Sequence, residues 1–266
     1  MKIARDKESR RRLPGLLVAE GYSRHPFDTE FGVRTSGLVA GRHLKSGHRH
    51  DRHATAYFGV APSVFAELMA RWRRSRPGMR VEEFAFVDAG AGMGRALLLA
   101  AEMPFRSVTG VELNPTLARI ARRNAALWRA AGRARSRTKV VCGDVTEFRY
   151  PAGHCVLFLF NPFGATVMRK LMGSVARQFA ERPEELDLIY VNNEQEGVLE
   201  GELGFARMFV GSVSRSRADA RADKAILGNQ PEGEYAYARY EECSTWRWMG
   251  RPERKHKAGG FSSGGN

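Results

Sequence analysis

The sequence lacks the features that organise several classes of protein. Its 266 residues include only three cysteines, and Cys142, Cys155 and Cys243 form no CxxC pair. This excludes a disulfide framework, a zinc knuckle and a thioredoxin-like redox motif. No window approaches the roughly 20 consecutive apolar residues of a membrane-spanning helix, and the short apolar stretch at 13–19 lacks the cleavage site of a signal peptide. We therefore expect a protein of the reducing cytoplasm.

Acidic residues are scarce relative to basic ones. The chain has 29 Asp and Glu against 43 Lys and Arg, which gives a formal net charge of +14. Such an excess attracts nucleic acid, an anionic membrane surface or an acidic substrate, and it has no bearing on the fold. The arginines are also scattered, as a genome-wide preference for arginine codons would produce. An anionic partner such as nucleic acid and a compositional bias are therefore equally open.

The length and composition predict one main core with additions at both ends. The chain is 43% hydrophobic, and 266 residues lie near the upper limit of a single domain. We expect an N-terminal arm and helix over residues 1–78, a core over 79–250 and a disordered tail over 251–266. The arm is charged and irregular until Pro62, which suits the first turn of a helix that ends before Pro77.

Apolar runs alternate with amphipathic stretches from residue 84 onward. This alternation is typical of a doubly wound α/β sheet with helices on both faces. The predicted strands are 84–88, 107–112, 139–144, 154–160 and 186–191, and the predicted helices are 95–102, 115–131 and 165–180. Two later stretches, 206–213 and 234–240, are predicted as strands that form an antiparallel pair.

The strongest motif joins the first predicted strand to its helix. Residues 87–95 read VDAGAGMGR, which places Gly90, Gly92 and Gly94 in the turn and Asp88 before it. Ligands of open α/β sheets bind outside the carboxyl ends of the strands, and glycines there allow a close approach. Dinucleotide fingerprints read G-x-G-x-x-G and seat a pyrophosphate. The G-x-G-x-G spacing with a preceding carboxylate favours a cationic nucleoside cofactor instead.

Carboxylates also end the second and third predicted strands. Glu112 is placed to accept hydrogen bonds from both hydroxyls of a ribose. Asp144 is placed to accept from an adenine amino group, while the backbone N–H of Val145 addresses a ring nitrogen. Three carboxylates at three consecutive strand ends are more specific than any one of them. Taken singly, each has an ordinary explanation as a helix cap or turn residue.

With these residues, the segment 84–191 resembles the class I S-adenosylmethionine-dependent methyltransferases. It resembles more narrowly a widespread bacterial group with an Asp-x-Gly-x-Gly-x-Gly-Arg turn, Met-Pro-Phe-Arg before a Gly-Val-Glu strand, and Asn-Pro-Phe. The resemblance implies a Rossmann-like, seven-stranded methyltransferase sheet and S-adenosylmethionine as the cofactor, which makes residues 79–250 the catalytic core. It supplies no methyl acceptor.

The segment Asn161-Pro162-Phe163 follows the fourth predicted strand. It is similar to the Asn-Pro-Pro-aromatic motif of enzymes that methylate planar amines, where the Asn side chain and the Pro carbonyl accept from the attacking NH₂ and the ring stacks on the substrate. This chain has one proline instead of two, and its Asn-x-Phe is also similar to non-SET lysine methyltransferases. The resemblance implies catalytic roles for these three residues and favours a nitrogen acceptor in a protein, a nucleic acid or a small amine.

Further residues are predicted to contact the substrate. Asn192 and Glu194 follow the fifth strand and so face the cofactor edge of the sheet, although turn formation would also explain them. Tyr57 belongs to a set of aromatic residues in the arm that either close over the site as a lid or anchor the arm on the core. The other members of that set are Tyr22, Phe27, Phe31 and Phe58.

Three alternatives stay open at this point. The histidines at 43, 48, 50 and 53 could bind a metal, but we predict none because their surroundings are basic and no ligand set accompanies them. A nicotinamide-dependent oxidoreductase could use the same glycine turn. A nucleic-acid-binding module could keep a vestigial cofactor pocket, with salt-dependent binding and no methyl transfer.

Overall fold

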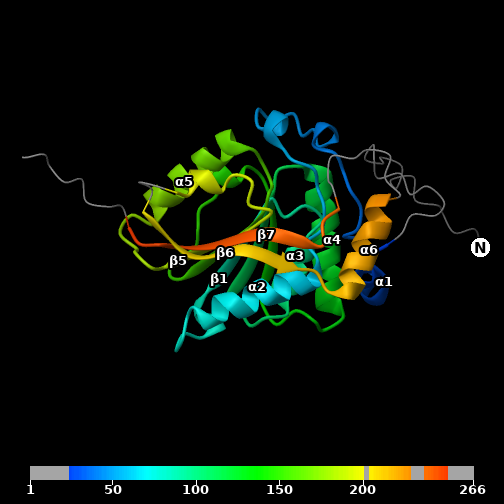
Figure 1. The fold of residues 1–266 in the computed structure, drawn as a ribbon, viewed down its shortest axis with the longest axis horizontal. Helices are drawn as coiled ribbons and strands as arrows, with labels where there is room; N and C mark the ends of the chain where they lie inside the picture. The colour runs from blue at the N-terminus through cyan, green and yellow to red at the C-terminus, as the bar shows by residue number, and fades with distance from the viewer. Residues whose placement is uncertain (1–23, 201–203, 229–236, 251–266) are drawn as a thin grey trace, which may run out of the picture.

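The seven strands of the described residues lie in one sheet. The computed structural model describes residues 24–200, 204–228 and 237–250 (Figure 1). The strand order is β3-β2-β1-β4-β5-β7-β6. The bounds are β1 (Ala85–Ala89), β2 (Ser107–Glu112), β3 (Thr138–Cys142), β4 (Cys155–Phe160), β5 (Leu186–Val191), β6 (Phe205–Ser214) and β7 (Tyr240–Trp248). The first five strands along the chain, β1 to β5, are mutually parallel. Strand β7 runs antiparallel to β5 and β6. This confirms the doubly wound, seven-stranded methyltransferase-type sheet.

Helices cover both faces of the sheet. Figure 1 shows α5 on one side and α2 and α3 on the other. The bounds are α2 (Pro62–Arg74), α3 (Arg95–Ala101), α4 (Pro115–Ala130) and α5 (Ala165–Gln178). Successive strand residues point to opposite faces, so Phe86 and Phe158 share a core cluster with α2, α3 and α4, while Val87 and Leu157 share one with α5. Both faces need apolar side chains, which explains the continuous apolar runs of the central strands.

The last two strands differ from the prediction in their position. The strand at 206–213 is confirmed. Of the strand predicted at 234–240, residues 234–236 lie outside the described residues and 237–239 form no strand, so the antiparallel partner of β6 is β7, which begins at Tyr240. The polar residues of β7 hide it from an apolar-run analysis. The helix α6 (Arg217–Gly228) was not predicted, since alanines alternate with charged residues in its sequence RADARADKAILG and leave no apolar helical period. Its buried carboxylates form internal contacts, such as the bond that Asp219 accepts from the Ser63 N–H (2.8 Å).

The described part of the N-terminal arm packs on the core as an irregular chain with one short helix, α1 (Pro26–Phe31). The rings of Phe27 and Phe31 lie 5.4 and 5.1 Å from that of Trp128 in α4, so both residues anchor the arm. The guanidinium of Arg95, the first residue of α3, is buried and donates to Thr35 Oγ1 (2.7 Å) and the Gly59 carbonyl (3.1 Å). The arm is thereby fastened beside the glycine turn.

Several sequence expectations fall beyond this description. Tyr22 and the tail at 251–266 lie outside the described residues. The division of the chain at residues 78 and 250 stays a prediction. Within the described ranges, no helix combines the length and the apolar character that a membrane crossing requires.

A buried carboxylate ties α2 and the turn after it to strands β5 and β7. Asp187 in β5 is 3% exposed and accepts from Arg76 Nε (2.7 Å), Arg247 Nε (2.8 Å) and Trp72 Nε1 (2.9 Å). These donors come from α2, the turn after it and β7. Each of these partners lies in an apolar setting. Removing the carboxylate therefore leaves the guanidinium groups of Arg76 and Arg247 without a counter-charge.

We expect Asp187→Ala to lower the free energy of unfolding by about 3–5 kcal/mol, since it leaves both guanidinium groups without a counter-charge. Chemical denaturation monitored by circular dichroism measures this loss. The control is Glu67→Ala, which removes an exposed partner of Arg71 and should change stability by no more than about 1 kcal/mol. Equal effects of the two substitutions would contradict the assigned role of Asp187.

Candidate cofactor and acceptor site

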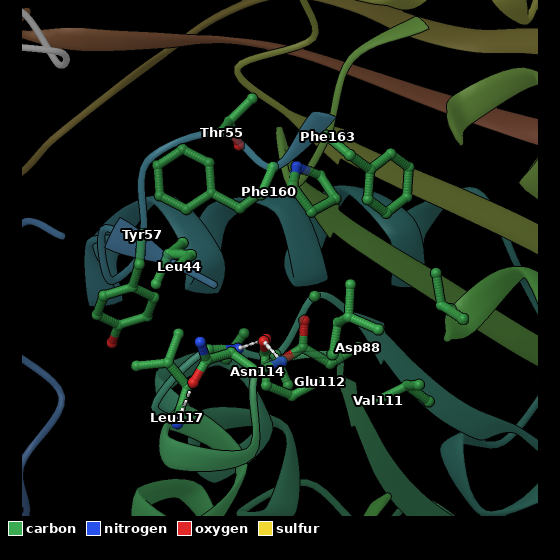
Figure 2. Close-up of a pocket in the computed structure, with 18 of the residues that line it drawn as sticks. Leu44, Thr55, Tyr57, Asp88, Val111, Glu112, Asn114, Leu117, Phe160 and Phe163 are labelled. Carbon is green, nitrogen blue, oxygen red and sulfur yellow. Dashed lines mark hydrogen bonds between the residues drawn. The ribbon is translucent and has the colours of Figure 1, made fainter. Parts of the chain in front are cut away.

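A cavity opens at the carboxyl ends of β1, β2, β3 and β4. In Figure 2, Asp88, Glu112 and Asn114 lie on one side of it, and Thr55, Phe160 and Phe163 on the other. Of the predicted cofactor-binding residues, those that line the cavity are Asp88, Gly90, Gly92, Glu112, Asp144 and Val145. Gly94 does not line it. A Cβ there would lie 3.2 Å from Ala121 Cβ, so this glycine serves the packing of α3 on α4.

The first two glycines of the turn are required by both conformation and space. Gly90 and Gly92 have φ values of +77° and +54°, which disfavour any other residue. A Cβ on Gly90 would overlap the ring of Pro162, and one on Gly92 would overlap the ring of Tyr57. Pro162, from the predicted catalytic segment, therefore packs on Gly90, and Tyr57, from the arm, packs on Gly92. Both side chains lie at the cavity.

Glu112 joins the glycine turn to the start of α4. Its Oε2 accepts from the Gly92 N–H (2.8 Å) and its Oε1 from the Asn114 N–H (2.7 Å), as the dashed lines of Figure 2 show. Burial raises the pKa of Glu112, and the two backbone donors act against that rise. Each oxygen keeps a further lone pair for a ligand hydroxyl.

Asp88 is a buried carboxyl without a charged partner. It is 3% exposed, and among the described residues its Oδ2 has no hydrogen-bond donor. Burial, together with the neighbouring charge of Glu112, raises the pKa of Asp88 to about 8. The cavity therefore contains an acid that is mostly neutral at pH 7 and that a nearby cation would ionise.

Asp144 faces the arm, in a contact that the sequence analysis missed. Its Oδ1 accepts from the Thr146 N–H (2.9 Å), and its Oδ2 lies 3.1 Å from His50 Nδ1 and 3.9 Å from His48 Nε2. Burial and the charge of Lys170 lower the pKa of His50 against the opposing effect of Asp144. The His-x-His spacing was the one available signal for this cluster.

The side chains of His48, His50 and Asp144 lie close enough together to hold a metal ion. The absence of a metal stays a prediction, which the position of Lys170 favours, because its Nζ lies 3.1 Å from His50 Nε2. An ammonium can only donate, so Nε2 is the acceptor and the imidazole proton belongs on Nδ1, facing Asp144. Metal binding through Nδ1 would turn an Nε2–H toward the ammonium. The contact between His50 and Asp144 is electrostatic, because its angles are not those of a hydrogen bond.

The segment that follows β4 is held by the arm. The Thr55 N–H donates to the Pro162 carbonyl (3.4 Å), the Thr55 hydroxyl donates to the Asn161 carbonyl, and the Gly164 N–H donates to the His53 carbonyl (3.0 Å). The Pro162 carbonyl, which the resemblance assigned to the acceptor amine, is thus already bonded to Thr55 in this structure. Within this segment, the polar group that stays available to a ligand is the side-chain oxygen of Asn161. Asn161 is 7% exposed, and its Oδ1 has no partner among the described residues.

A second cavity adjoins the first beyond Thr55 and Phe160, which line both. Its lining consists of Thr55, Ala56, Phe58, Phe160, Asn161, Asn192 and Glu194. The fold thus brings together Asn161, Asn192 and Glu194, which the sequence analysis had singled out. Asn161 and Asn192 have φ values of +34° and +48°. Non-glycine residues in that region are uncommon and often mark functional sites.

Tyr57 and Phe163 line only the first cavity. The Tyr57 hydroxyl donates to the Thr35 carbonyl (2.7 Å), so its ring is fixed against the glycine turn on the cofactor side. Phe58, a member of the aromatic set of the arm, lines both cavities. Thr55 was not predicted as an acceptor-site residue, because nothing in an irregular arm shows from the sequence which residues reach the sheet edge.

Comparisons with known proteins return structural similarities alone. No family model matches the chain, and no curated protein matches it. Among solved structures, it is similar to the precorrin-6y C5,15-methyltransferase of Geobacter metallireducens GS-15, with 16% identity and a TM-score of 0.46 over 68% of this chain and 85% of that one. It is similar to the 23S rRNA methyltransferase ErmE, with 18% identity and a TM-score of 0.43 over 70% and 69%.

The [4+2]-cyclase SpnF is also similar, with 16% identity and a TM-score of 0.47 over 70% of this chain and 82% of that one. Similarities of this size assign no activity, so the chemistry of this chain rests on its own cavity residues.

Proposed function

We propose that the protein is an S-adenosylmethionine-dependent methyltransferase that acts on a nitrogen acceptor. One observation carries this proposal: a cavity with buried carboxyl groups adjoins a second cavity that contains an unpartnered amide oxygen. The first suits a cationic nucleoside, and the second suits an N–H donor. Both lie at the carboxyl edge of the sheet, where ligands of open α/β folds bind.

The carboxyl groups that line the first cavity fit this cofactor. Glu112 would accept from the ribose hydroxyls, and Asp88 offers a buried acid to the positive charges of the cofactor. Asp144 and Val145 would meet the adenine, provided that Asp144 shares its Oδ2 with His50. S-adenosylmethionine supplies a methyl group that its sulfonium has already activated. The residues of this chain therefore need only bind, orient and exclude water.

Asn161 is placed to orient the acceptor nitrogen. Its buried Oδ1 can accept an N–H bond, which directs the nitrogen lone pair away from the Asn161 side chain. Most of the rate would come from holding the nitrogen at a near-attack distance of ~3–3.5 Å. Glu194 is exposed at the second cavity, where it can pass the released proton to water.

The cofactor assignment predicts calorimetric binding of S-adenosylmethionine and S-adenosylhomocysteine without binding of NAD. Glu112→Gln should weaken both by about tenfold or more, because an amide nitrogen cannot accept a ribose hydroxyl bond. The control Glu102→Gln removes an exposed partner of Arg133 and should leave affinity unchanged. Binding of NAD in place of the other two compounds would show instead an oxidoreductase.

Cofactor affinity should rise with pH. The ionised form of Asp88 is the one that attracts a cation, and because its pKa is raised to about 8, ionisation is gained as pH increases from about 6.5 to 9. The association constant of S-adenosylmethionine should grow by up to about tenfold per pH unit below pH 8 and then level off. In Asp88→Asn this part of the pH profile should vanish. A profile shared by both proteins would mean that Asp88 does not face the bound cation.

Asn161→Ala should abolish methyl transfer without loss of cofactor binding. We expect transfer of labelled methyl groups to fall at least a hundredfold, since a positioning and transition-state hydrogen bond is lost. A screen of RNA, basic proteins and small amines supplies the acceptor for this assay. Asn193→Ala is the matched control, because the Asn193 side chain donates to Glu196 (2.9 Å) and lines neither cavity. Full activity of Asn161→Ala would remove the amide from the mechanism.

A further inference from the structure

One segment of the chain carries more than half of the net charge. Residues 113–143 contain eight Lys and Arg and no Asp or Glu, so they supply +8 of the formal +14. This segment comprises α4, the following loop and β3. A codon preference alone would scatter the excess along the chain, whereas here it is concentrated on two neighbouring elements at one edge of the sheet.

Seven of these side chains are exposed, and none makes an ion pair with a residue that the structure describes. Six of them belong to α4 and the loop after it, and we name these six the basic face: Arg119, Arg122, Arg123, Arg129, Arg135 and Arg137. Lys139 alternates in β3 with Val140, which packs on the α4 side, so its side chain leaves the opposite face of the sheet. The eighth, Arg133, is paired with Glu102. On α4 the spacing of the arginines keeps them on one side of a helix about 24 Å long. The result is a ridge of unneutralised positive charge.

The basic face continues toward both cavities through the arm. Leu44 packs with Leu117 of α4, which places the neighbouring Lys45 beside the first turns of that helix. Lys45 and Arg52 are exposed, and the equally exposed Arg49 pairs with Glu147 (3.6 Å). The acidic side chain of this stretch, Asp51, is satisfied locally by the Ser46 and Gly47 N–H groups (both 2.8 Å). The positive surface thus runs from α4 along the arm, and the next residues of the arm line the second cavity.

Protection of an edge strand explains only part of this charge. β3 is at the edge of the sheet, and Arg122 Nε donates to the Val140 carbonyl (3.3 Å), which shields that edge. Arg119, Arg123 and Arg129 lie on α4 and protect no strand. A face that carries arginines without intervening carboxylates is the electrostatic footprint expected for a phosphate backbone.

We propose that the basic face and the arm bind the backbone of a single-stranded nucleic acid, one base of which enters the second cavity. This inference rests on the proposed function and makes an amino group of a nucleobase the methyl acceptor. A base paired in a duplex could not reach Asn161, which is 7% exposed, without leaving the stack. Phe58 and Phe160 line the same cavity, so a base that enters it meets aromatic side chains.

The test is fluorescence anisotropy with a labelled single-stranded RNA of mixed sequence, over a range of salt concentrations. The triple variant Arg119→Ala/Arg122→Ala/Arg123→Ala should bind at least tenfold more weakly, and its slope of log affinity against log salt should be shallower by about 2 units. The matched control removes three exposed arginines around the end of α2, in Arg73→Ala/Arg74→Ala/Arg80→Ala. It should bind like the parent protein.

Equal losses in both triple variants, or no binding at all, would overturn the inference. Stronger binding to anionic lipid vesicles or to duplex RNA of the same length would do so too, by showing another anionic partner. Calorimetry with S-adenosylmethionine separates the two proposals. Cofactor binding without RNA binding refutes this inference alone, and RNA binding without cofactor binding refutes the methyltransferase. If both bind, nucleoside analysis of RNA incubated with labelled cofactor should find the methyl group on a base nitrogen.

Discussion

The burial of three carboxyl groups at one edge of the sheet is the constraint on which the rest of the site depends. An ionised carboxylate is costly to bury unless charges or hydrogen bonds compensate for it. Each is stabilised differently: Glu112 accepts two backbone N–H bonds, Asp144 faces an imidazole of the arm, and Asp88 has a pKa raised to about 8. Their incomplete pairing favours a cationic ligand in the cavity.

The arm connects this electrostatic arrangement to the acceptor side. His50 meets the carboxylate that ends the third strand, Tyr57 packs on the glycine turn, and Thr55 bonds to the backbone after β4. A single stretch of irregular chain therefore contacts both cavities. Movement of this stretch would change the surroundings of the cofactor and of the acceptor together. The buried guanidinium of Arg95 limits such movement, because it fixes an earlier part of the arm to α3.

Much of the fold could be predicted from the sequence, because central strands buried on both faces leave continuous apolar runs. The strands at 107–112 and 186–191 have the predicted bounds. Strand β7 and helix α6 could not be placed in this way, because charged and polar residues interrupt their apolar residues, and internal ion pairs hold those charges. Arg215 pairs with both Asp223 and Glu241, for example, which joins α6 to β7. Such long-range pairs leave no periodic signal.

The residues of the candidate site also fall into a predictable group and an unpredictable group. Residues at strand ends were predictable, since the topology of a parallel sheet brings them to one edge whatever their neighbours are. The contributions of the arm were not, because His50 and Thr55 reach that edge through contacts that only the folded chain defines. This difference matters for the acceptor. The strand-end residues Asn161 and Glu194 provide a hydrogen-bond acceptor and a carboxylate that suit many amines, so specificity among amines must come from the surfaces around them. The arm supplies the surface that lines the second cavity, and its positive charge, with that of α4, is the property on which the proposal of a nucleic-acid acceptor rests.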